Sequence, residues 1–406
     1  MHGSSSGHRI GLAVLITAAG VAGGLFVNGR AATADTYLPS EGGAAYYKQW
    51  TNGRLGQADF FPISVWLQDP DRAAAYKAIG VNQFVGLWKG PTDVQLARLT
   101  AAGMSVFCDQ KPGAIRGPSS GIIQGWVMSD EPDNAQEKFG GGWGSCILPP
   151  VVATEYRRLK QADPGRPVLL NLGQAIANET WPGRGEFCSR HDEHYPEYIR
   201  ATDIVSYDVY PVNEKVPLWY VGKGVDRLRK WAEYKKPVWN WIETTSISGG
   251  PKPLPSQVKS EVWISIIHGS MGIGYFCHSF KPKESEAELL EDAEMRQGVA
   301  AVNGQVASLA AVLNAPSVAN GVTVASSNGK SPIDVMLKRQ NGATYLFAVG
   351  GRPGGATTAT FQLRDAPAKL TAEVVGESRT VTVAGGKFED RFGDYQVHIY
   401  RLPWAP

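Results

Sequence analysis

The sequence has few of the residues from which metal and disulfide sites are built. Its 406 residues include 4 cysteines and 7 histidines, and no two cysteines have the Cys-x-x-Cys spacing of a zinc or redox site. A metal-dependent barrel hydrolase would need a His-x-His pair on an early strand, and none is present. The nearest approach to a metal site is His191 and His194 with Asp192 and Glu193 between them, a loop motif of low specificity. We therefore expect neither a metal nor another cofactor.

The chain also lacks a strong net charge. Its 40 Lys and Arg residues against 38 Asp and Glu residues leave a formal charge of +2 at pH 7. A nucleic-acid-binding surface needs a clustered surplus of positive charge. The composition thus gives no reason to expect nucleic acid or an anionic membrane as a partner. With 43% hydrophobic residues, the chain is long enough to bury one large core and a smaller second one.

Long apolar runs are absent outside the N-terminal region. There, His8 and Arg9 precede an apolar stretch from Ile10 to Val27, and Ala-Thr-Ala at 32–34 matches the pattern that signal peptidases recognise. We expect residues 1–34 to be a signal peptide and the mature protein to be secreted or periplasmic. An uncleaved anchor is the alternative, because the stretch is somewhat long, although its glycines and alanines make it a weak membrane span. We expect no integral membrane domain.

The mature chain repeats one unit: a short apolar strand, a turn, and a helix with apolar residues at helical spacing. Helices are predicted between the strands, for instance at Asp71–Ile79, Thr92–Ala102, Val152–Ala162 and Ser256–His268. Eight such units predict a closed (β/α)8 TIM barrel over residues 35–315 rather than a doubly wound sheet. The predicted strands are Phe61–Leu67, Gln83–Leu87, Ser105–Cys108, Ile123–Met128, Val168–Asn171, Ile204–Tyr207, Val238–Ile242 and Gly272–Phe276.

The pattern changes after a last predicted helix at Val299–Leu313. From residue 316 to 406 the chain consists of short alternating segments, such as Thr344–Val349 and Thr380–Val383, separated by turns rich in Gly and Asn. Such spacing is typical of antiparallel β structure. We therefore predict a small all-β sandwich domain after the barrel.

Two glutamates occupy positions that barrel enzymes use for catalysis. Glu131 follows the fourth predicted strand in Gly-Trp-Val-Met-Ser-Asp-Glu-Pro-Asp, and Glu243 follows the seventh in Pro-Val-Trp-Asn-Trp-Ile-Glu-Thr-Thr. The carboxyl ends of barrel strands are where catalytic side chains lie. Taken singly, Glu131 could be a carboxylate at a helix N-terminus, and Glu243 could cap the loop that follows it. Their joint placement favours a catalytic pair.

The eight units, the Asp-Glu-Pro acid at the fourth strand, the Glu at the seventh and the trailing sandwich resemble the clan A, or 4/7, superfamily of glycoside hydrolases. The resemblance covers roughly residues 55–406. It implies a retaining hydrolase of O-glycosidic bonds, acting on a β-linked poly- or oligosaccharide. It also implies that Glu131 is the acid/base and Glu243 the nucleophile. Double displacement holds two such carboxyl groups roughly 5–5.5 Å apart, so only the closed barrel can bring these residues together.

The chain departs from the superfamily at Asp130, where an Asn usually precedes the acid. A carboxylate at this position accepts a hydrogen bond but cannot donate one as an amide does. Its charge would raise the pKa of Glu131 if the two carboxyl groups face one another. This departure leaves the sugar undefined.

Further polar and aromatic residues end or follow other strands, where loops display ligand groups. We expect them to contact the carbohydrate, although a tryptophan could instead close the top of the barrel, and His278 could be structural. Tyr210 lies where superfamily members often donate a hydrogen bond to the nucleophile. The expected substrate-binding residues are Trp66, Trp88, Asp109, Asp130, Asn171, Asp208, Tyr210, Trp241 and His278.

Two cysteines lie in loops that follow consecutive strands. Cys146 and Cys188 stand in Gly-rich stretches, so an oxidising compartment could join them in a disulfide. Cys108 and Cys277 lie in apolar runs typical of buried free thiols.

A non-catalytic carbohydrate-binding protein on the same fold is the main alternative function. It would keep the tryptophans but would not need both glutamates.

Overall fold

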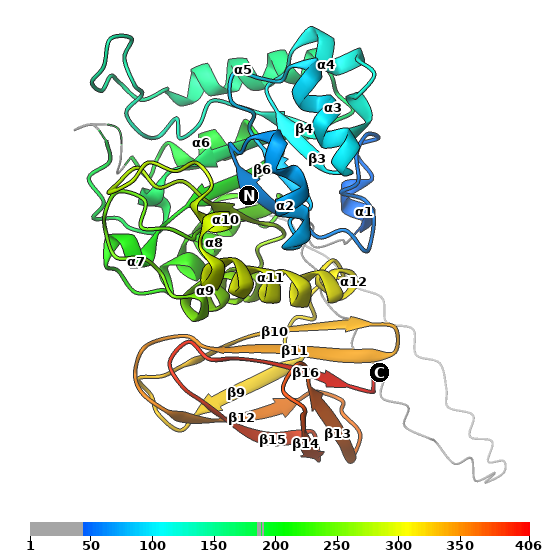
Figure 1. The fold of residues 1–406 in the computed structure, drawn as a ribbon. Coiled ribbons are helices and arrows are strands. Elements are labelled where there is room, and N and C mark those ends of the chain that lie inside the picture. The colour runs from blue at the N-terminus through cyan, green and yellow to red at the C-terminus, as the bar shows by residue number, and fades with distance from the viewer. Residues whose placement is uncertain (1–43, 185–187, 189–190) are drawn as a thin grey trace, which may run out of the picture. The chain divides into compact units, whose positions relative to one another are not determined.

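Eight parallel strands close into a barrel in the computed structural model, which describes residues 44–184, 188 and 191–406. The predicted signal segment lies outside the described residues. Each strand pairs with its neighbours in chain order, and β8 returns to pair with β1 (Figure 1). The barrel strands are β1 (Ile63–Trp66), β2 (Gln83–Val85), β3 (Ser105–Cys108), β4 (Ile123–Val127), β5 (Val168–Leu172), β6 (Ile204–Asp208), β7 (Val238–Glu243) and β8 (Ile273–Phe276).

The predicted TIM barrel is thus confirmed, with differences only at strand ends. The first strand is shorter than expected because Leu67 adopts a left-handed backbone with φ of 47°, which ends the extended conformation. Helix boundaries follow local signals. Thr92 and Gln95 form a capping box at the start of α3, and Gly103 ends that helix in the left-handed conformation.

Helices surround the barrel, as Figure 1 shows. The predicted last helix begins earlier than expected, because the Asp292 side chain accepts a hydrogen bond from the backbone N–H of Met295 and caps it. The α-helices are α1 (Ala44–Tyr47), α2 (Ala73–Ala78), α3 (Asp93–Ala102), α4 (Pro112–Arg116), α5 (Pro149–Ala162), α6 (Tyr195–Arg200), α7 (Pro211–Glu214), α8 (Tyr220–Trp231), α9 (Pro255–Ile267), α10 (Glu288–Glu291), α11 (Ala293–Ser308) and α12 (Ala310–Leu313). Short 3₁₀ turns are η2 (Pro70–Arg72), η3 (Ser120–Ile122) and η4 (Gln174–Ile176).

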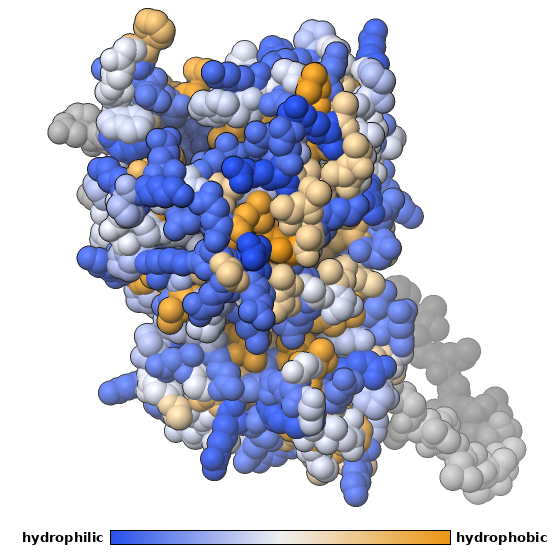
Figure 2. Space-filling view, viewed as in Figure 1, coloured by the Kyte–Doolittle hydropathy of each residue, from blue (hydrophilic) through white to orange (hydrophobic). Residues whose placement is uncertain are grey.

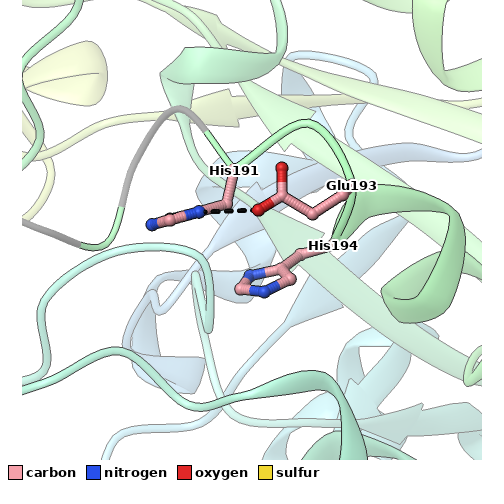
Figure 3. Close-up of side chains that lie close together, drawn as sticks. All are labelled: His191, Glu193 and His194. Atoms are coloured by element: carbon pink, nitrogen blue, oxygen red, sulfur yellow. Dashed lines mark hydrogen bonds and ion pairs between the residues drawn. The ribbon is translucent and has the colours of Figure 1, made fainter.

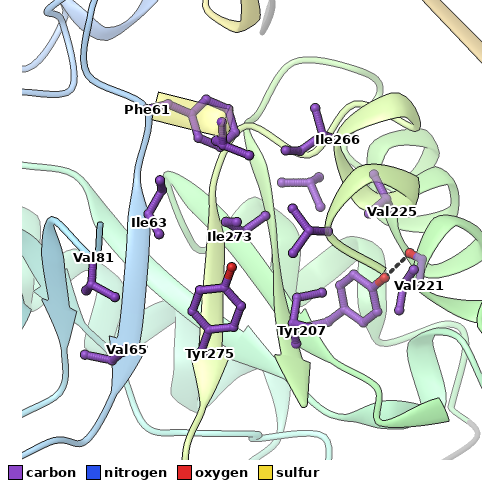
Figure 4. Packing of buried hydrophobic residues seen from close by; sticks show 14 of the residues in the cluster. Phe61, Ile63, Val65, Val81, Tyr207, Val221, Val225, Ile266, Ile273 and Tyr275 are labelled. Carbon is purple, nitrogen blue, oxygen red and sulfur yellow. Dashed lines mark hydrogen bonds between the residues drawn. The ribbon is translucent and has the colours of Figure 1, made fainter. Parts of the chain in front are cut away.

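Alternation along the strands builds two cores. On β7, Val238 and Ile242 face the helices, whereas Trp239 and Trp241 belong to an aromatic cluster inside the barrel. Figure 4 shows the outer layer, where the hydroxyl group of Tyr207 donates a hydrogen bond to the carbonyl oxygen of Val221. Because successive side chains alternate, Glu243 has the same inward parity as Trp239 and Trp241.

A second β domain follows the barrel, as predicted. Its eight strands form one antiparallel sheet in the order β10-β11-β16-β13-β14-β15-β12-β9. The sheet encloses its own apolar cluster, which includes Phe361, Phe388 and Tyr400. Its strands are β9 (Val322–Ser326), β10 (Ile333–Gln340), β11 (Ala343–Gly350), β12 (Thr357–Leu363), β13 (Lys369–Val374), β14 (Arg379–Ala384), β15 (Lys387–Phe392) and β16 (Val397–Leu402).

Strand β11 joins the apolar cluster around the barrel to the apolar cluster within the sheet, because it is apolar on both faces. Phe347 and Val349 belong to the cluster around the barrel, whereas Leu346 and Ala348 belong to the cluster within the sheet. The rings of Trp263 on α9 and Phe347 stack with centroids 5.8 Å apart. The sheet therefore packs on the barrel helices through one face and on its own core through the other.

Neither the surface nor the helices of the described residues indicate a membrane span. The side shown in Figure 2 is mostly hydrophilic, with hydrophobic residues gathered near its middle. Within the described part of the chain, every helix is too short or too polar to cross a bilayer.

A histidine also links barrel and sheet. Nδ1 of His268 lies 2.8 Å from Asp226 on α8, and its Nε2 lies 3.4 Å from Asp334 on β10. Burial lowers the pKa of His268, but the two carboxylates outweigh that effect and raise the pKa to about 9. The cations nearby are Arg229, which donates a hydrogen bond to the carbonyl oxygen of His268, and Arg352, 4.0 Å from Asp334.

This ion triplet should make stability depend on pH. The folded-state pKa of His268, about 9, exceeds the unfolded value near 6.5. The stabilisation that the triplet provides is therefore complete below about pH 6.5 and is lost as pH rises through 9. A shift of this size is worth at most about 3 kcal/mol. We expect His268→Gln to lower the unfolding midpoint at pH 6 and to have little effect at pH 10, as measured by thermal denaturation. An equal loss at both pH values would show that the side chain stabilises by packing and not by charge.

Candidate active site

A cavity of about 460 Å³ opens at the carboxyl ends of the barrel strands. This is the end at which barrel enzymes carry their active sites. The walls combine carboxyl groups, amides and aromatic rings. Its lining residues are Trp66, Asp130, Glu131, Asn134, Asn171, Gln174, Trp181, Arg184, Asp208, Tyr210, Asn213, Glu214, Trp241, Ile247, Ser248, Gly250 and Phe276.

Glu131 is the most constrained residue of the cavity. Its backbone φ of 42° is left-handed, which is strained for a residue with a side chain. Its Oε2 lies 2.6 Å from the guanidinium of Arg184 and accepts a hydrogen bond of 3.1 Å from Nδ2 of Asn134. A Cβ atom at position 173 would lie 3.2 Å from its Oε1, so Gly173 leaves room for the carboxyl group. The residue is 6% exposed.

Glu131 and Asp208 form a carboxyl pair. Burial raises the pKa of Glu131, while Arg184 and the hydrogen bonds from Asp208 and Asn134 lower it. Burial and the charges of Glu131 and Asp130 raise the pKa of Asp208 well above its usual range. The raised pKa favours the neutral form of Asp208, which can donate a hydrogen bond to Glu131. The two groups titrate as a pair, because ionisation of one disfavours ionisation of the other.

A chain of hydrogen bonds that runs from Trp241 through Ser206 and Asn171 to Asp208 orients this pair. Nε1 of Trp241 donates to Oγ of Ser206 at 3.1 Å, and that hydroxyl donates to Oδ1 of Asn171 at 2.9 Å. The amide of Asn171 is thereby turned so that its Nδ2 donates to Asp130 at 2.9 Å and to Asp208 at 3.3 Å. The direction of this chain is set by its first member, because an indole N–H donates only.

Asp130 and Asp133 surround Glu131 with further negative charge. Burial of its carboxyl group and then the charge of Glu131 raise the pKa of Asp130 to about 7, although the residue as a whole reaches solvent. Burial raises the pKa of Asp133 to about 6, against the hydrogen bonds that it accepts from Gly173 and Tyr195. Asp130 lies on the cavity wall, whereas Asp133 lies behind Glu131.

Glu243 lies behind the cavity wall and is fully buried, with 0% exposure. Its Oε1 accepts a hydrogen bond from the backbone N–H of Val212 at 2.6 Å, and its Oε2 accepts one from that of Asn213 at 3.0 Å. The side chain of Asn213 donates to Oε2 as well and lines the cavity. Burial raises the pKa of Glu243 to about 7, against these hydrogen bonds. In this conformation Glu243 caps α7, and Asn213 separates it from the cavity.

The other predicted site residues fall into three groups. Six line the main cavity with Glu131. Two, Trp88 and His278, line a neighbouring cavity. Asp109 is exposed at the end of β3 and lies outside the lining of both. The six in the main cavity are Trp66, Asp130, Asn171, Asp208, Tyr210 and Trp241.

Sequence analysis missed Arg184, the cation that contacts the acid. It also missed Asn134, whose Oδ1 accepts the backbone N–H of Arg184 at 2.8 Å and so ties that loop to Glu131. The guanidinium lies 5.2 Å from the ring of Trp143. The available signal was a lone Arg between glycines in the same Gly-rich loop as Cys188.

All four cysteines are free thiols. Cys146 and Cys188 lie side by side, whereas Cys108 and Cys277 are each buried separately. Burial and a hydrogen bond with Cys146 raise the pKa of the Cys188 thiol to about 11. The proposed disulfide between Cys146 and Cys188 is absent from the structure and stays a prediction for the oxidised protein.

The His191 loop brings three possible metal ligands together. Figure 3 shows His191, Glu193 and His194, whose ligand atoms all lie within 4.8 Å of one another. Nδ1 of His191 lies 2.8 Å from Oε1 of Glu193, and the two imidazole rings stack 4.9 Å apart. Glu193 is exposed and the two histidines are half-buried. The hydrogen bond between His191 and Glu193 gives these groups a role in the loop without a metal.

Comparison with known proteins identifies the fold. No family model and no curated protein sequence matches the chain. An α-amylase from Geobacillus thermoleovorans in complex with acarbose shares 9% identity over 85% of this chain and 98% of its own, with a TM-score of 0.51. A GH42 β-galactosidase from G. stearothermophilus shares 9% identity over 85% and 98%, with a TM-score of 0.54. A single-residue variant of AmyP in complex with maltotriose shares 8% identity over 86% and 98%, with a TM-score of 0.53. At such identities the similarity shows the fold.

The ion pair between Arg184 and Glu131 can be tested by titration. Because the guanidinium stabilises the ionised carboxylate, we expect Arg184→Ala to raise the pKa of Glu131. The measurement is NMR titration of protein carrying ¹³C in its glutamate carboxyl groups, with Glu131→Gln used to assign the signal. Arg227→Ala is the matched control, because Arg227 pairs with Glu179 and Asp192 and does not contact Glu131. An unchanged Glu131 titration in Arg184→Ala would show that this ion pair does not persist in solution.

Proposed function

We propose that the protein is a glycoside hydrolase and that the main cavity is its active site. The proposal is carried by Glu131 and Asp208, two buried carboxyl groups that line the main cavity at the carboxyl ends of β4 and β6 and whose interaction raises the pKa of Asp208. Amide, carboxyl and indole groups beside it offer the hydrogen bonds and apolar faces that a sugar requires. The substrate is therefore a carbohydrate.

The chemistry begins at Glu131. In the first step the pair gives its proton, through Glu131, to the leaving glycosidic oxygen, while the nucleophilic carboxylate bonds to the anomeric carbon and the glycosidic bond breaks. In the second step the oxygen of a water molecule bonds to the anomeric carbon, the bond to the nucleophile breaks, and Glu131 takes the proton from that water, which restores the pair. Asp208 keeps the proton near Glu131 at neutral pH, which is the task of a general acid with a raised pKa.

The nucleophile of the proposal is Glu243. It ends β7 with inward parity, at the same end of the barrel as Glu131, which follows β4. Asp208 is the poorer nucleophile, because burial and the charges of Glu131 and Asp130 raise its pKa well above the usual range and so favour its neutral form. Attack by Glu243 requires that the Asn213 side chain leave its present position. The proposed reaction is thus double displacement with a gated nucleophile.

Two further features of the proposal concern substrate and location. The similar structures include an α-amylase, a β-galactosidase and AmyP bound to maltotriose, and these are carbohydrate-active proteins by their descriptions. We place the mature protein outside the cytoplasm, on the N-terminal sequence pattern alone.

A non-catalytic sugar-binding protein would have no need to bury Glu131 beside Asp208, since burial of carboxyl groups is unfavourable.

Replacement of the two glutamates tests the roles. Glu243→Ala should lower turnover at least about a thousandfold with the fold intact, because the attacking group is lost. Glu131→Ala should slow glycosides with poor leaving groups far more than activated aryl glycosides. Azide should rescue the two variants with glycosyl azides of opposite anomeric configuration, measured by ¹H NMR. Glu294→Ala, an exposed acid on α11, is the control and should behave as the wild type.

Three outcomes would overturn parts of this assignment. Inversion at the anomeric carbon in the wild-type reaction would exclude double displacement. Azide rescue of Asp208→Ala, without rescue of Glu243→Ala, would make Asp208 the nucleophile and leave Glu243 as the cap of α7. Absence of hydrolysis over a panel of polysaccharides and aryl glycosides would overturn the enzymatic function itself.

A further inference from the structure

A second cavity of about 370 Å³ adjoins the main one. The side chains of Trp66 and Phe276 line both cavities, so the two lie side by side. The main cavity lies over β4 to β8 and reaches Trp66 on β1, whereas the second lies over β8, β1 and β2, which are neighbours in the barrel. Its lining residues are Trp66, Leu67, Trp88, Phe276, His278, Ser279, Phe280, Glu284, Ser285 and Glu286.

One wall of the second cavity is a row of rings that starts in the main cavity. The ring of Phe276 lies 5.4 Å from that of Tyr210 and 5.1 Å from that of His278, and His278 stacks on Phe280 at 6.1 Å. Residues 276, 278 and 280 alternate along the chain that leaves β8, and such residues lie on one face of an extended segment. The row therefore leads from Tyr210, which hydrogen-bonds Asp208, away from the acid.

The opposite part of the cavity carries an exposed indole. Trp88 is 67% exposed and Phe280 is 52% exposed, although large aromatic side chains are usually buried. Exposed aromatic groups gathered at a cavity indicate a binding surface. Nδ1 of His278 is buried and makes no hydrogen bond to the described residues. The cavity thus offers apolar faces together with an unused polar atom.

The chemistry of these walls selects the ligand. A pyranose ring presents apolar C–H faces to aromatic rings and hydroxyl groups to polar atoms at its edges. Glu284 and Glu286 add negative charge to the lining, which disfavours an anionic ligand such as a uronic acid or a sulfated sugar. Neutral sugar units fit this combination.

We propose that the second cavity binds additional neutral sugar units of the chain that is cleaved at Glu131. The substrate is then an oligo- or polysaccharide that occupies the barrel end from β6 past β8 to β2. This inference rests on the proposed function, because the first cavity must hold the scissile bond. Trp88 and Phe280 are the residues that set the preference for longer chains.

The test measures affinity against chain length. Cello-, manno-, xylo- and malto-oligosaccharides of two and five units are titrated calorimetrically into Glu131→Gln, which keeps the side-chain size and removes the acid. For the sugar that binds, five units should bind at least about tenfold more tightly than two. Adding Trp88→Ala and Phe280→Ala should abolish this gain and leave the affinity for two units unchanged. Adding Tyr234→Ala, an exposed aromatic at the opposite end of the barrel, should preserve the gain.

The results separate this inference from the proposed function. Equal affinity for two and five units, or a gain that survives loss of Trp88 and Phe280, would overturn the second binding site. If the wild type hydrolyses none of the panel while the length-dependent gain is present and lost in the double variant, the site is supported and the enzymatic function fails. Hydrolysis of the panel together with a lost gain in the variant supports both.

Discussion

The cavity depends on one electrostatic constraint: several carboxyl groups lie together out of water. Like charges at this range are tolerated only when protons or donors are shared among them. The structure supplies both, through the Glu131–Asp208 pair and through the amides of Asn134 and Asn171. The Trp241–Ser206–Asn171 chain, the Arg184 loop and the strained backbone of Glu131 all follow from the need to hold these groups in place.

The same constraint explains why Asp130 is compatible with the acid. An Asn at this position would donate to its neighbours, whereas Asp130 accepts from Asn171 and has a pKa raised to about 7. Its carboxyl group therefore keeps a proton to a higher pH than that of an ordinary aspartate. When ionised, Asp130 raises the pKa of Asp208, so its titration is linked to that of the Glu131–Asp208 pair.

The sequence predicted the barrel because strand periodicity and helix spacing are local, and local signals survive in a repeated unit. Glu131, Asn171, Asp208 and Trp241 were found by their place at strand ends. Arg184 was not, because its role depends on the path of a long loop. The setting of Glu243 could not be read either. Its burial results from the turn of α7, and nothing near residue 243 reveals that Val212 and Asn213 bring their N–H groups to it.

The two-faced strand β11 has a consequence for how the chain is made. The apolar cluster around the barrel includes Phe347 and Val349 on β11 and Ile399 on β16, and β16 pairs with β11 along its length. Both strands follow the barrel in the chain. During translation, the surface of α9 that carries Trp263 therefore stays uncovered until β11, whose Phe347 packs on it, has emerged from the ribosome. The last strand of the sheet closes a core that begins more than three hundred residues earlier, at Phe61.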